Sequence, residues 1–142
     1  MGVTFQVPFV HGLQRHRMTR YGHAYDTERN HADKQSIAAL YRNACRQEPK
    51  MRPTCAPKRV PVAIDIDICR ELPQSAPRRV VHEPDLHKPD VDNVAKLVLD
   101  ALSGVAYEDD VQVEHLSVHK LHRRRGIHDH MTVTVRRSDW GD

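Results

Sequence analysis

Hydrophobic and polar residues alternate in three separate segments of the chain, a pattern typical of strands with one buried face. The first is VTFQVPF, residues 3–9, in which Pro8 marks the end of the strand or an edge position. The second is RVPVAIDIDIC, residues 59–69, whose valines and isoleucines fall on one face. The third is HMTVTVRR, residues 130–137. These segments are expected to form strands.

A fourth segment, VQVEHLSVHKL at residues 111–121, also has the composition of a strand. Its alternation shifts phase between Val113 and Leu116, which indicates a β-bulge. A basic link, HRRRGIHDH, separates it from the last strand. We expect these two strands to pair as a hairpin across that link.

Two other segments have helical spacing of apolar residues. The first helix is predicted over residues 32–46, with Asn30 or Asp33 as its cap. The second begins near Asp90 or Asp92, either of which could cap it. It carries apolar residues at i, i+3, i+4, i+7 and i+8 and is followed by a glycine placed to end it: Val94, Leu97, Val98, Ala101, Leu102 and Gly104.

The length of 142 residues fits one domain, so we expect a single domain over residues 1–142. The fold class expected is α+β, with two main helices packed on a mixed or antiparallel β-sheet. Because no apolar run approaches the roughly 18 residues of a membrane span, we expect a cytosolic protein. The spacing of Cys45, Cys55 and Cys69 fits neither a zinc knuckle nor a disulfide framework, which indicates reduced thiols.

The charge is unevenly distributed along the chain. The net charge is +3, yet residues 83–110 contain eight acidic side chains and two lysines, so the rest of the protein is strongly basic. This distribution suits a protein that binds a polyanion over a broad basic surface and contacts it at one place with metal-bound carboxylates. The alternative is that these charges only solvate the surface.

The acidic segment contains a candidate metal site. Asp90 and Asp92 lie where the proline-rich connection 70–89 meets the second helix, and Lys96 follows one turn later, about 6 Å along the axis. Asp109 and Asp110 could join them if residues 103–108 ran back along the helix, whose length is about 16 Å. Oxygen ligands favour Mg²⁺ or Mn²⁺ over zinc, and phosphodiester hydrolysis is the reaction expected.

Each of these carboxylates also has a simpler structural interpretation. Asp92 could only cap a helix, and the pair Asp109 and Asp110 could only form a turn. Asp100, deep in the second helix, is assigned to a solvated or salt-bridged face. Asp65 and Asp67 alternate on a strand and are expected at the surface. The histidines lack the spacing of a zinc site.

The string KPDVDNVAKLVLDAL, followed by EDDVQV and Lys120, resembles the signature of the RusA-type Holliday-junction resolvases. These are small endodeoxyribonucleases, often encoded by phages and prophages, that act in DNA recombination and repair. The resemblance is close over residues 88–120. It implies a Mg²⁺-dependent homodimer in which each subunit cuts one strand of a four-way junction. Two symmetric cuts also require two equivalent active sites.

The resemblance implies a role for each matching residue. Asp90, Asp92 and Asp110 would be the catalytic, metal-binding carboxylates, and Lys96 the catalytic lysine. Asp109 matches the first member of the aspartate pair, with a less certain role at the metal. The expected DNA contacts are Arg15, Arg17, Arg20, Asn93, Lys120, Arg123, Arg124 and Arg125.

Alternatives remain open for two tyrosines and for the function of the whole protein. Tyr21 and Tyr25 could stack on opened bases or pack beneath their own loop. The whole protein could be a non-catalytic junction-binding protein, or a nuclease of the same fold that cuts flaps or forks. The complete set of carboxylates and lysine argues against a pure binding module, because negative charge at the phosphates weakens DNA binding.

Overall fold

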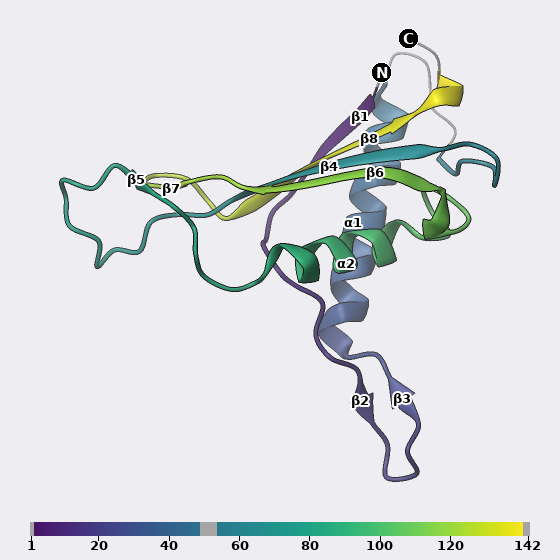
Figure 1. Ribbon diagram of the computed structural model, residues 1–142, viewed down its shortest axis with the longest axis horizontal. Coiled ribbons are helices and arrows are strands. Elements are labelled where there is room, and N and C mark those ends of the chain that lie inside the picture. Colours follow the sequence, from purple (N-terminus) through teal and green to yellow (C-terminus); the bar gives the residue numbers. More distant parts are fainter. Residues whose placement is uncertain (1, 49–53, 141–142) are drawn as a thin grey trace.

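The computed structural model of the protein describes residues 2–48 and 54–140. It contains a four-stranded sheet in the order β1-β8-β4-β6, with two helices on one face (Figure 1). The prediction of an α+β fold with two main helices on a mixed sheet is confirmed. The sheet and helices are β1 (Gly2–Val7), α1 (Glu28–Gln47), β4 (Val62–Cys69), α2 (Val91–Leu102), β6 (Val113–Lys120) and β8 (His130–Arg137).

The predicted alternation along β4 is confirmed. Its valine and three isoleucines are buried against the helices, in one core with side chains of β1, β8, α1 and α2. Asp65 and Asp67 lie on the opposite face of the sheet. Asp65 forms an ion pair with Arg136 at 2.7 Å, and Asp67 lies 3.9 Å from His119. Both carboxylates therefore belong to the polar face, as expected.

The predicted hairpin between β6 and β8 is wrong. β6 pairs with β4 in parallel, whereas β8 lies between β1 and β4 and is antiparallel to both. The physical reason is the helix between β4 and β6, because a strand–helix–strand crossover returns the chain parallel to its first strand. The predicted bulge is confirmed: Val62 pairs with Val113 but Ala63 pairs with His115.

α1 begins four residues before the predicted start. Thr27, not Asn30 or Asp33, is its N-cap, and the Thr27 hydroxyl accepts a hydrogen bond from the Asn30 backbone N–H at 3.1 Å. Asn30 and Asp33 are buried within the first turns. Their polarity suggested a cap, but their side chains instead bind the loop that precedes the helix.

α2 ends as predicted, with Ser103 as its C-cap and Gly104 in the left-handed region at φ +78°. The chain then turns tightly. The Ala106 N–H donates to the Leu102 carbonyl at 2.7 Å, and the Tyr107 hydroxyl donates to the Leu99 carbonyl at 2.6 Å. Residues 103–107 therefore stay at the C-terminal end of α2 and do not run back along it, contrary to expectation.

Two small antiparallel ribbons project from the body in different directions (Figure 1). One pairs β2 (Arg17–Met18) with β3 (Ala24–Tyr25), and the other pairs β5 (His82–Glu83) with β7 (Arg123–Arg124). Short 3-10 helices are η1 (Asp110–Gln112) and η2 (Ser138–Trp140). Over residues 2–48 and 54–140, no helix is long and apolar enough to cross a membrane, and the three cysteines form no disulfide.

Candidate active site

Asp90 and Asp92 lie exposed at the first turn of α2. Asp90 occupies the N-cap position, yet its side chain makes no capping hydrogen bond. Within the described residues, neither carboxylate has a hydrogen bond or an ion pair through its side chain. The interpretation of these aspartates as simple helix caps therefore fails for Asp90, whose carboxylate is available to a ligand.

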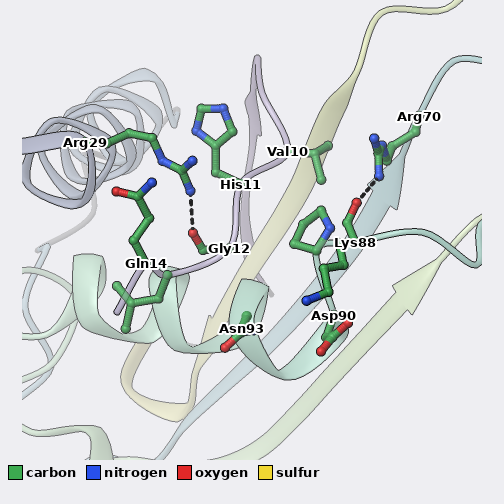
Figure 2. A pocket seen from close by; sticks show the side chains of 11 residues that line it. Val10, His11, Gly12, Gln14, Arg29, Arg70, Lys88, Asp90 and Asn93 are labelled. Carbon is green, nitrogen blue, oxygen red and sulfur yellow. Dashed lines mark hydrogen bonds between the residues drawn. The ribbon is translucent and has the colours of Figure 1, made fainter. Parts of the chain in front are cut away.

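A cavity of about 360 Å³ opens beside Asp90 (Figure 2). Its walls come from three parts of the chain: the loop after β1, the start of α1, and the segment that leads from β4 into α2. The residues that line it include Gly12, Arg29, Arg70, Lys88, Asp90 and Asn93. Three of the eleven lining residues are cationic, and although Arg29 and Arg70 also donate to backbone carbonyls of the wall, the cavity offers positive charge to a phosphate next to the exposed carboxylate.

The loop over this cavity is fixed to both helices. The Leu13 N–H donates to the Asn93 carbonyl at 3.0 Å. The Asn30 side-chain amide exchanges two hydrogen bonds of 2.9 Å with the backbone of Gln14. A Cβ on Gly12 would lie 2.9 Å from the Pro89 Cβ and 3.0 Å from the Asn93 Cβ, so only glycine permits this approach. These contacts hold the loop in place as one wall of the cavity.

Two cations hold the segment that precedes Asp90. Arg70, after the end of β4, donates to the Lys88 carbonyl at 2.5 Å (Figure 2). Lys120, at the end of β6, donates to the adjacent His87 carbonyl. The Lys120 ammonium therefore contacts the protein backbone beside the cavity. The DNA contact expected of Lys120 from sequence stays a prediction.

Arg70 and its neighbour Asp85 were not predicted as site residues. The Asp85 side chain is fully buried and one of its oxygens lies 3.9 Å from an Arg70 nitrogen, while the other oxygen has no hydrogen-bond partner. Arg70 also lies 3.7 Å from Asp129. Neither residue belongs to a recognisable motif, and the contact joins segments fifteen residues apart, so no local pattern could have found it.

Lys96 is exposed on α2, one turn beyond Asp92. It lines a second cavity with Asn93 and with Arg15 of the loop. Within the described residues, its ammonium has no hydrogen bond or ion pair. Lys96 and Asn93 therefore lie on the side of α2 that faces the loop after β1, which carries Arg15.

Asp109 and Asp110 lie at the other end of α2, where η1 precedes β6. Asp109 is the N-cap of η1 and accepts a hydrogen bond from the Val111 N–H at 3.2 Å, which lowers its pKa. The hydrogen bond with the Asp109 carboxyl and the nearby negative charges raise the pKa of Asp110. Asp109 thus has a capping role. The neighbours of Asp110 disfavour its negative charge, which a bound cation would stabilise.

Gln112 fixes this pair in place and was also missed as a site residue. It is only 7% exposed. Its side-chain oxygen accepts hydrogen bonds from the N–H groups of Glu108 at 2.8 Å and Asp109 at 3.0 Å. Its side-chain nitrogen donates to three carbonyls before β4, those of Ala56, Pro57 and Val60. The glutamine of the EDDVQV string therefore positions the aspartates.

Gln112→Ala is expected to lower the free energy of unfolding by about 1–3 kcal/mol, because buried carbonyl and N–H groups lose their partner. Urea denaturation followed by circular dichroism measures the change. Gln74→Ala, at an exposed glutamine in a loop, is the matched control and should change stability by less than about 0.5 kcal/mol. Equal stability of both variants would contradict the positioning role.

The two acidic pairs do not meet within one chain. No group of three histidine, cysteine, aspartate or glutamate side chains lies close enough to hold a metal ion anywhere in residues 2–48 and 54–140. Asp90 and Asp92 lie at one end of α2 and Asp110 beyond the other, about 18 Å apart by the rise of a 12-residue helix. One chain therefore carries two separate acidic pairs, Asp90 with Asp92 and Asp109 with Asp110, called here the first and the second half-site.

The remaining candidates fall into clear groups. Asp100 lies 3.9 Å from Lys34, which confirms its assignment to a salt-bridged face. Tyr21 and Tyr25 are exposed on the β2–β3 ribbon and do not pack beneath it. Arg15, Arg17 and Arg20 are exposed in the same region. Arg123 and Arg125 hold backbone carbonyls of the segment 71–80 through their guanidinium groups.

Comparison with known protein families gives one match. The family model described as Endodeoxyribonuclease RusA matches residues 8–136, which include the loop after β1, both helices, both half-sites and the strands β4 and β6. No curated protein matches the chain. Because the match spans most of its length, the chain belongs to the RusA family of endodeoxyribonucleases, which resolve Holliday junctions.

Proposed function

We propose that the protein is a Mg²⁺-dependent, homodimeric endonuclease that resolves four-way junctions by paired phosphodiester hydrolysis in DNA recombination and repair. The observation that carries the proposal is the Asp90 carboxylate, which occupies a helix N-cap without capping it. Asp92 and Lys96 lie on the same helix, and a cavity with three cationic side chains opens beside them. Carboxylates for a metal and cations for a phosphate are thus adjacent.

The donor set of the first half-site fits Mg²⁺. Mg²⁺ is usually bound by one or two carboxylates together with water and substrate phosphates, and Asp90 and Asp92 supply two carboxylates with oxygen donors only. Mn²⁺ accepts the same donors. When bound, such an ion would lower the pKa of a water molecule and stabilise the leaving oxyanion.

The protein's own side chains would supply the rest of the reaction. Lys96 places a positive charge one turn from Asp92, where it can neutralise charge that develops on the phosphate. Arg70 and Lys120 hold the backbone that carries Asp90. The Asn93 carbonyl accepts the Leu13 N–H of the loop after β1, so the phosphate would bind between that loop and α2.

A homodimer would complete each site. A two-fold axis that crosses α2 near its middle would bring the N-terminal end of each helix to the partner's C-terminal end, and hence Asp90 and Asp92 to a second Asp110. Val91 is 42% exposed beside the first pair and Val111 is 83% exposed beside Asp110. Contact between them would remove two apolar side chains from water, which favours this arrangement.

Cleavage of matched synthetic DNA substrates tests the proposal. We expect paired incisions in a four-way junction with Mg²⁺, no incision with a chelator, and slower cleavage of a flap and a fork of the same sequence. Binding of the junction without product would favour the non-catalytic alternative. Faster cleavage of the flap or fork would favour a nuclease with a different substrate.

A further inference from the structure

The acidic site does not account for the second projecting ribbon. It is built from residues 70–84 and 121–129, here called the β5–β7 arm. The arm continues from the C-terminal ends of β4 and β6 and extends beyond the sheet (Figure 1, left). Arg70 lies at the base of the arm and also lines the cavity beside Asp90. The arm therefore begins at the candidate active site.

The arm has a defined conformation because its two segments bind each other. Arg125 donates to the carbonyls of Ala76 at 3.0 Å, Pro77 at 2.6 Å and Val80 at 3.2 Å. The backbones of Leu72 and Arg124 are joined at 2.9 Å, and the His82 and His122 rings meet with 2.8 Å between their Nδ1 atoms.

This framework leaves a concentrated positive charge exposed. Arg78 and Arg79 directly follow the pinned Pro77, and both side chains are exposed, as is Arg124. Within the described residues, none of these three guanidinium groups has a hydrogen bond or an ion pair. Asp129, an acid of the same arm, is already bound to the Glu71 N–H at 2.9 Å. The arm contains six arginines and three acids, Glu71, Glu83 and Asp129, so it keeps a net positive charge.

We propose that the β5–β7 arm binds the phosphate backbone of one duplex arm of the branched DNA, away from the point of cleavage. This inference rests on the proposed function and adds a surface to it. Exposed, unpaired guanidinium groups suit phosphate oxygens, and contacts to the backbone need no particular sequence. The arm would hold the duplex that leads away from Asp90, with Arg78 and Arg79 as its principal contacts.

The variant that tests the inference is R78Q/R79Q, with R42Q/R46Q as its control. The control removes the same charge from exposed arginines of α1. If Arg78 and Arg79 each bind a phosphate, the ratio of wild-type to variant affinity for a junction should fall about tenfold between about 50 mM and 200 mM salt. The control should retain the wild-type salt dependence.

A junction with trimmed arms, each closed by a hairpin loop, locates the contact. On this DNA, wild type and R78Q/R79Q should bind equally, because the duplex that the arm would hold is missing. Equal affinities on the long junction at every salt concentration would overturn the inference and point to an acidic protein as the partner instead. A loss that persists on the trimmed junction would overturn the assigned location. Binding is measured without cleavage, so failure of the proposed function would be seen separately.

Discussion

Asp90→Asn is expected to lower single-turnover cleavage of a four-way junction about a thousandfold or more, while the affinity for the junction is retained. The substitution keeps the size of the side chain and removes the negative charge that would hold the cation. Because Asp90 makes no capping hydrogen bond, the fold should not suffer. Cleavage at saturating protein and binding in a chelator measure the two effects separately.

Asp100→Asn is the matched control for this experiment. It makes the same chemical change on the same helix, at a carboxylate that lies 3.9 Å from Lys34 and is not one of the expected metal ligands. Its cleavage should stay within a few-fold of wild type. Full activity of Asp90→Asn, or an equal loss in the control, would contradict the assignment of Asp90 to the metal site.

The strands, the second helix and the bulge could be predicted from sequence because each has a local cause. The valine and isoleucines of β4 are buried at every second position, and the change of phase after Val113 corresponds to the extra residue opposite Val62 and Ala63. Gly104 ends α2 because it adopts a positive φ. In these cases the pattern and the structure have the same physical origin.

Sheet pairing could not be predicted in the same way. β6 and β8 follow each other along the chain across a basic link, which suggested a hairpin, but Arg123 and Arg124 of that link pair with the proline-rich segment as β7 and β5 instead. The choice depends on α2, whose packing against α1 and β6 sets β6 parallel to β4. The alternation of apolar and polar residues within β6 or β8 does not depend on which strand each one pairs with, so it cannot predict the pairing.

The candidate site shows the same division. The residues at the start of α2 could be found from their spacing, because one turn of helix places Asp92 and Lys96 on one side. The role of Gln112 could be found only in part: its side-chain oxygen binds the N–H groups of the nearby Glu108 and Asp109, but its nitrogen binds backbone carbonyls more than fifty residues earlier. The expected return of residues 103–108 was geometrically possible, but the hydrogen bonds around Leu102 and Tyr107 favour a tight turn.

A mixture of Asp90→Asn and Asp110→Asn chains is expected to regain cleavage that neither variant has alone. If each site takes Asp90 from one chain and Asp110 from its partner, a mixed dimer has one doubly defective site and one intact site. The intact site should cut one strand, so the product is a nicked junction and not a pair of resolved duplexes. Co-refolding the two chains and separating products on native and denaturing gels measures both outcomes.

The control for this mixture is Asp90→Asn combined with Asp92→Asn. Both substitutions lie at the same end of α2, so every site of their mixed dimer carries one defect and no activity should return. Rescue in the first mixture alone means that two chains share each metal site, which explains why no group of three ligands occurs within the described residues. If neither mixture regains activity although mixed dimers form, each chain must assemble its own site, and α2 and η1 must then rearrange when DNA binds.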